Sequence, residues 1–148
     1  MRWDLEELTE DAFVAYLEQQ VGGEMRVYTA WGFNEAQYPC AIVHAGETEP
    51  VSEEAEWHDS RAMSVEVAVI VEATEKGNKT ARETNASIRS MVMDALATSD
   101  LNTLLIGMQT PDIAFSMAQL ASTARTVEDR KMITTMSLMV IAEPVTGS

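Results

Sequence analysis

Apolar residues recur at helical spacing near the start of the chain. From Leu5 to Val21 they fall three and four residues apart, and Asp4 with Glu7 has the spacing of a capping box at a helix start. Two glycines follow, and glycine readily adopts the left-handed conformation that closes a helix. The pattern therefore predicts a first helix over residues 5–21.

Further along the chain, the patterns favour strands. Residues 63–72 alternate strictly between apolar and polar side chains, as a half-buried strand requires. Residues 25–33 and 40–45 are rich in β-branched and aromatic types. Residues 132–141 are apolar on both faces, which is typical of a strand in the middle of a sheet or at a subunit contact.

A second helix is predicted over residues 80–96, where Thr80 and Glu83 have capping-box spacing ahead of an apolar stripe. Residues 113–120 are ambiguous between the two periods, and the polar interval 122–131 resembles a connection. The order of elements predicts an α+β fold, with a mainly antiparallel sheet and both helices packed on one face.

The segment 46–60 breaks these patterns. It is acidic and contains Pro50 but no hydrophobic period, and so long a loop in a compact domain is usually functional or mobile. An aromatic residue in polar surroundings, such as Trp57, often anchors a partner, although it could also pack back onto the domain. Five residues of the loop are predicted to contact a partner: Glu53, Glu54, Glu56, Trp57 and His58.

Length and composition bound the class of protein. The 148 residues, 46% of them hydrophobic, fit one domain over 1–148, with a long acidic loop at 46–60 and a short flexible C-terminal tail at 143–148. Ten Lys and Arg against 24 Asp and Glu give a net charge of -14. That charge repels phosphate, which argues against a general nucleic-acid binder and against binding to anionic membranes.

No catalytic signature is found. The single cysteine, Cys40, is predicted to be a buried apolar residue in a reducing compartment, about 13 Å from His44 along a strand. Five residues resemble metal ligands: His44, Glu47, Glu49, His58 and Asp59. They contain no closely spaced histidine pair that would fix a geometry, so a solvated acidic loop is preferred. We expect no enzyme activity, no metal and no cofactor.

The succession of elements resembles the tail terminator, or tail-completion, proteins of long-tailed bacteriophages. The likeness is carried by the N-terminal helix, strands at 27–31 and 40–45, the charged loop ending in His58-Asp59-Ser60-Arg61, the strand 64–71, the helix 80–96 and the terminal apolar strand. It covers most of the chain. The resemblance implies a structural virion protein of the tail or neck region, assembled in the host cytoplasm.

The resemblance also implies partners. Such proteins form a ring, typically a hexamer, that caps the tail tube, ends its polymerisation and joins it to the head-tail connector or neck. DNA passes through the lumen without specific binding, which acidic walls favour by repulsion, and no membrane is involved. Met136, Leu138 and Val140 are expected in the ring interface or the sheet. The alternative is an acidic inhibitor that mimics nucleic acid.

Overall fold

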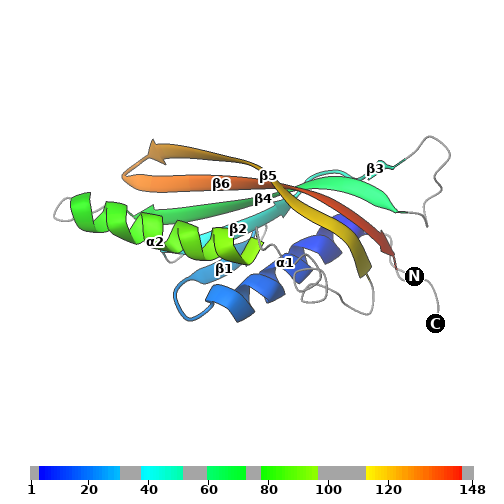
Figure 1. Ribbon diagram of the computed structural model, residues 1–148, viewed down its shortest axis with the longest axis horizontal. Helices are drawn as coiled ribbons and strands as arrows, with labels where there is room; N and C mark the ends of the chain where they lie inside the picture. Colours follow the sequence, from blue (N-terminus) through cyan, green and yellow to red (C-terminus); the bar gives the residue numbers. More distant parts are fainter. Residues whose placement is uncertain (1–3, 31–37, 52–59, 73–77, 97–112, 145–148) are drawn as a thin grey trace.

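The computed structural model describes residues 4–30, 38–51, 60–72, 78–96 and 113–144 (Figure 1). In chain order the elements are α1 (Leu5–Val21), β1 (Arg26–Thr29), β2 (Cys40–Ala45), β3 (Glu49–Pro50), β4 (Arg61–Glu72), α2 (Asn78–Leu96), β5 (Ile113–Glu128) and β6 (Lys131–Pro144). Two helices and a mostly antiparallel sheet make this an α+β fold, so the predicted class is confirmed.

The six strands form one sheet in the order β1-β2-β4-β6-β5, with β3 paired to β4 off this path. β1 and β2 are parallel, and the other pairs are antiparallel. β6 pairs with β4 along one edge and with β5 along the other. The last apolar strand therefore lies inside the sheet, and the prediction made from its two apolar faces is confirmed.

Burial alternates along β4, where every second residue from Arg61 to Val71 is buried. The matching side chains of β2 and β6 form one apolar cluster with side chains of both helices. α1 contacts β1 and β2, and α2 contacts β4 and α1. Phe13 of α1 meets Phe115 of β5 edge to face, with ring centroids 6.4 Å apart, an arrangement that stabilises aromatic pairs.

One buried hydrogen bond joins the two helices. The Tyr16 hydroxyl donates to the carbonyl oxygen of Ala95 over 2.7 Å. Carbonyls in the last turn of a helix lack an intrahelical donor, so Tyr16 satisfies a group that would otherwise be unpaired. Burial also raises the pKa of Tyr16, because a phenolate here would lose its hydration.

The helix ends differ from the predicted ones. Asp4 precedes α1 but its side chain makes no capping bond, so the predicted capping box is wrong. Gly22 is right-handed, with φ -62°, and its N–H donates to the Glu18 carbonyl over 3.0 Å. A Cβ at Gly22 would lie 2.3 Å from that carbonyl oxygen, so close approach favours glycine here. α2 begins at Asn78, before the predicted Thr80.

The largest departure from prediction is β5. The connection predicted at 122–131 is wrong, because β5 continues to Glu128 and β6 begins at Lys131. Asp129 and Arg130 form the turn, with φ of 46° and 60°. Two residues with positive φ are typical of a two-residue hairpin loop, which usually contains glycine. This turn has none, so its sequence does not signal a hairpin.

Smaller corrections concern strand limits. β1 ends at Thr29, and the predicted continuation beyond residue 30 lies outside the described residues. β3 occupies Glu49–Pro50, inside the predicted loop 46–60. β6 runs to Pro144, into the predicted tail at 143–148. Among the described residues, no helix has the length and apolar character to cross a membrane.

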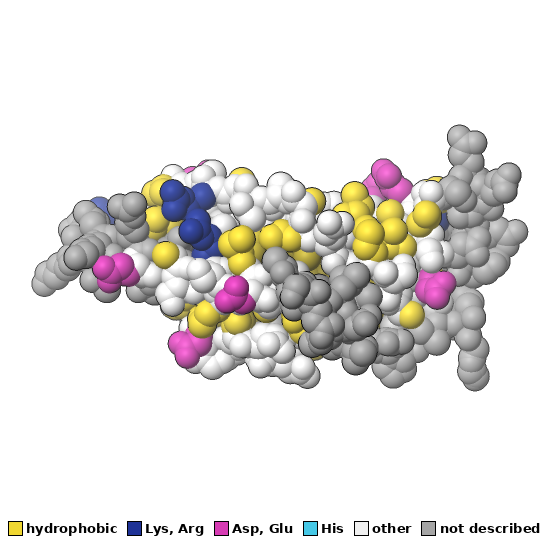
Figure 2. Space-filling view, in the orientation of Figure 1, with side chains coloured by type: hydrophobic (Ala, Val, Ile, Leu, Met, Phe, Trp, Pro, Cys, Tyr) yellow, Lys and Arg dark blue, Asp and Glu magenta, His cyan; other side chains and the backbone are white. Residues whose placement is uncertain are grey.

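The molecule is elongated, and its two ends differ (Figure 1). The turn between β5 and β6 lies at one end, while the start of α1, the end of β2 and β3 lie towards the other. In the same orientation, Lys and Arg side chains gather on the left of the visible face, towards the end that carries the turn (Figure 2). The ends therefore offer different chemistry to a partner.

Candidate functional site

An acidic pocket lies where the first turns of α1 face the end of β2. It encloses about 630 Å³. Ten residues line it: Asp4, Glu6, Glu7, Glu10, Asp11, Thr29, His44, Ala45, Gly46 and Glu47. Six of these ten side chains are carboxylates. The pocket therefore attracts positively charged groups and repels phosphate.

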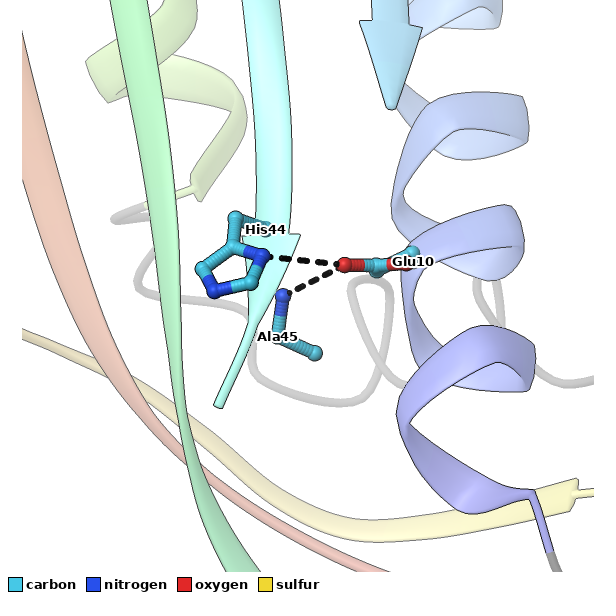
Figure 3. A network of polar contacts seen from close by, with 3 residues as sticks. All are labelled: Glu10, His44 and Ala45. Atoms are coloured by element: carbon cyan, nitrogen blue, oxygen red, sulfur yellow. Dashed lines mark hydrogen bonds and ion pairs between the residues drawn. The ribbon is translucent and has the colours of Figure 1, made fainter. Parts of the chain in front are cut away.

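Glu10 fastens α1 to β2 at the wall of this pocket (Figure 3). Its Oε2 accepts a hydrogen bond from the Ala45 N–H over 2.9 Å and lies 3.4 Å from His44 Nδ1. The Glu10 side chain is 5% exposed, whereas that of His44 is 50% exposed. A buried carboxylate is strongly unfavourable unless it is hydrogen-bonded, so these contacts explain how Glu10 is accommodated.

A second set of bonds holds the chain that follows β2. The Thr48 N–H donates to Glu6 Oε1 over 3.1 Å. Arg61, at the start of β4, donates from Nε to Thr48 Oγ1 over 2.9 Å and from its terminal nitrogen to the Thr48 carbonyl over 3.3 Å. Glu6 and Glu10 therefore support the pocket wall, while Asp11 and Glu47 are exposed at its surface.

A second candidate surface is the side of β4 and β6 opposite the apolar cluster. We call it the charge-poor face and define it by ten residues paired across the two strands: Ala62, Ser64, Glu66, Ala68, Ile70, Ile133, Thr135, Ser137, Met139 and Ile141. All ten are exposed or half-buried, with Met139 46% exposed. Glu66 is the one charged residue among them, and the next pair on the same side, Glu72 with Lys131, is charged and ends the face. Such depletion of charge is typical of the core of a protein contact.

Neither Cys40 nor the acidic side chains of the described residues form a metal site. Cys40 is buried, as predicted, and burial raises the pKa of its thiol to about 11, partly offset by the charge of Lys131. A thiol with that pKa stays protonated and is a poor nucleophile. Within the described ranges, no group of three or more His, Cys, Asp or Glu side chains could hold a metal ion.

The residues predicted as metal ligands do not form one site in the described chain. His44 and Glu47 line the acidic pocket, and Glu49 lies in β3. His58 and Asp59 lie outside the described residues. The loop residues predicted to contact a partner also lie outside them: Glu53, Glu54, Glu56, Trp57 and His58.

Met136, Leu138 and Val140 lie in β6, each no more than 1% exposed, within the apolar cluster. They pack into the core of their own chain. The exposed and half-buried positions of this strand alternate with them and include Met139 and Ile141. A contact made by the face of β6 therefore uses the alternate residues.

The carboxylates of the first helix are evident in the sequence, but their proximity to His44 and Glu47 is not. The position of Glu10 in the helix does indicate that its carboxylate is buried. Glu10 lies three residues before Phe13 and seven before Leu17, in line with the apolar stripe that α1 buries. An acid on a buried stripe indicates a carboxylate with dedicated hydrogen-bond donors.

No family model and no curated protein matches this chain. Among solved structures, it is similar to a chain described as "Virion of native gene transfer agent (GTA) particle". The TM-score is 0.49 at 16% sequence identity, over 86% of this chain and 84% of the other. Function is therefore inferred from the surfaces of this chain.

Proposed function

We propose that this protein is a structural virion protein that forms a ring on the tail tube, ends tube polymerisation and joins the tail to the head-tail connector or neck. The observation that carries the proposal is the charge-poor face. In a chain with a net charge of -14, ten paired positions on two long strands include a single charged residue, and charge returns only at the end of the ladder, where Glu72 pairs with Lys131. Extended surfaces of low charge are typical of subunit contacts.

A ring built from one kind of subunit requires two different patches that fit each other, because each copy meets its neighbours head to tail. This chain offers different chemistry at its two ends, with the acidic pocket towards one end and the β5–β6 turn at the other. Such asymmetry is compatible with a closed ring, for which we propose six copies.

The charge of the protein also suits a conduit for DNA. A net charge of -14 repels phosphate, so acidic walls would let DNA pass without holding it. The proposed partners are further copies of the chain, the tail tube protein and the connector or neck protein. The role needs no catalysis, no cofactor and no membrane, and assembly would take place in the host cytoplasm.

The test is capping of tail tubes. Purified protein is added to polymerising tube subunits, and tube lengths and ends are measured by electron microscopy. We expect shorter tubes of uniform length with a ring at one end, whereas an equal amount of an unrelated acidic protein should leave the lengths unchanged. Unchanged tubes, together with a protein that stays monomeric at high concentration, would contradict the proposal.

The acidic pocket favours a second candidate, an inhibitor that mimics nucleic acid. Six carboxylates around one hollow present concentrated negative charge to a basic partner. This function predicts stoichiometric binding to a nucleic-acid-binding enzyme, competition with DNA or RNA, and no ring on tail tubes. Capping without such competition would exclude it.

A further inference from the structure

The last part of β5 is exposed to solvent along its whole length. All residues from 121 to 130 are exposed, and we call this stretch the outer segment. Its ladder with β6 is continuous from the Ser122–Ser137 pair to the Glu128–Lys131 pair. Among the described strands, β5 pairs with β6 alone, so its other edge is unpaired.

Unpaired strand edges attract other chains, and natural proteins usually blunt them with bulges, proline or charge. The register shifts of β5 lie between Phe115 and Met117 and, at the very start of the outer segment, between Leu120 and Ser122. The outer segment has no proline, and its one large apolar side chain, Val127, is 65% exposed. It is therefore a regular, accessible edge.

The outer segment also differs in charge from the rest of the chain. It carries two basic residues, Arg125 and Arg130, and two acidic ones, Glu128 and Asp129, so it is neutral in a chain of net charge -14. Arg125 is exposed and makes no ion pair with any described residue. Lys131 holds its ammonium 4.9 Å from the centre of the Tyr38 ring.

The first turns of α1 and the end of β2, which line the acidic pocket, lie towards the opposite end of the molecule (Figure 1). That separation prevents the outer segment from reaching the pocket of its own chain, but it suits a contact between copies arranged head to tail. Attraction between Arg125 and the carboxylates of the pocket would orient each copy as it arrives and disfavour the reversed orientation.

We infer that the outer segment of one copy docks beside the acidic pocket of the next copy, with Arg125 facing the carboxylates around Glu47. The inference rests on the proposed ring and adds a second pair of surfaces to the contact proposed for the charge-poor face. The contact is heterologous, since each copy gives its outer segment to one neighbour and its pocket to the other. Repeated around the ring, this contact acts together with the charge-poor face to close the assembly.

A directed disulfide tests the contact. Val127→Cys and Glu47→Cys are made separately on differently tagged chains, both at exposed positions, while the native Cys40 is buried. The two proteins are mixed under mild oxidation, with and without tail tubes. We expect a mixed disulfide dimer at least ten-fold more abundant than in a control mixture of Val127→Cys with Glu24→Cys, an exposed acid that does not line the pocket.

Equal yields in the two mixtures, or no mixed disulfide in either, would overturn the inference. Charge exchange gives an independent measurement of the same contact. Arg125→Glu should weaken self-association at least ten-fold, and adding Glu47→Arg in the same chain should restore it, whereas no loss or no rescue would count against the contact. If the protein caps tubes but no mixed disulfide forms, the proposed function holds and only this inference is wrong.

Discussion

β4 and the outer segment of β5 belong to one mostly antiparallel sheet, yet only β4 is evident in the sequence. β4 buries every second residue, so its apolar and polar positions alternate. The outer segment is exposed on both faces, so neither set of positions is under pressure to be apolar. Hydrophobic periodicity in a sequence therefore indicates a strand with one buried face. A strand that is held only by backbone hydrogen bonds to its neighbour shows no such periodicity.

The comparison also separates two sources of stability. β4 is held by its neighbours β2 and β6 and by the apolar cluster beneath it. The outer segment is held by hydrogen bonds to β6 and by its two-residue turn. Segments with little buried apolar surface open most readily, so we expect the outer segment to open before β4 does.

The largest effect is expected from a charge on the buried side of β4. Val67 is 0% exposed and pairs with Val43 and Met136, so Val67→Asp places an unpaired carboxylate in the apolar cluster. The cost should exceed about 4 kcal/mol, a large part of the roughly 5–15 kcal/mol that stabilises a domain. We expect no cooperative transition in thermal unfolding.

Thr126→Asp, on the outer segment, is the matched control for Val67→Asp. Thr126 is exposed, so its replacement should change the free energy of unfolding by no more than about 0.5 kcal/mol. A cooperative transition near the wild-type temperature in Val67→Asp, or unfolding of Thr126→Asp, would contradict the contrast between the two strands.

A smaller loss is expected from Glu10→Ala. The change leaves the buried Ala45 N–H without the carboxylate that accepts its hydrogen bond, which should destabilise the fold by about 1–3 kcal/mol in chemical denaturation. Asp11→Ala, at the exposed neighbouring position, should have little effect. Equal losses in the two variants would show that Glu10 does not fasten α1 to β2.

Much of the architecture is predictable because burial leaves periodic patterns. The α+β class, the strand at 63–72, the two main helices and the interior position of the last strand follow from apolar spacing. The packing of both helices on one face stays a prediction. β5 is not predictable in this way, because its outer residues face solvent and its turn lacks glycine.

The candidate site is less predictable than the fold. The acidic pocket combines the first helix with residues more than thirty positions later, and single-sequence patterns do not encode that proximity. Met136, Leu138 and Val140 are apolar because the core requires it, so their type does not indicate an interface. We propose the alternate positions, such as Met139 and Ile141, as the contact residues on this strand.

The turn should respond to glycine. Asp129 and Arg130 have positive φ, a conformation that costs an ordinary L-residue about 1–2 kcal/mol. Replacing the pair by Asn and Gly, Asp129→Asn with Arg130→Gly, should stabilise the protein by about 1 kcal/mol in urea, because both residues accept this conformation. The control, Asp129→Asn with Arg130→Ala, keeps a Cβ at position 130 and should stabilise the protein less. Equal stabilisation by the two variants would show that the positive φ at position 130 is not the cause.

The smallest effect on stability, and a large effect on reactivity, is expected from a thiol on the outer segment. Cys40 is 0% exposed, and with a pKa of about 11 only about one thiol in a thousand is ionised at pH 8. Thr126→Cys adds a second thiol at an exposed position, with a change in unfolding free energy below about 0.5 kcal/mol. With an excess of a thiol reagent, the thiol at position 126 should react within seconds, and Cys40 should react only after denaturation. If Cys40 reacted as fast as the new thiol, the Cys40 thiol would be accessible to the reagent, and the contrast between the buried interior of the sheet and the exposed outer segment would be wrong.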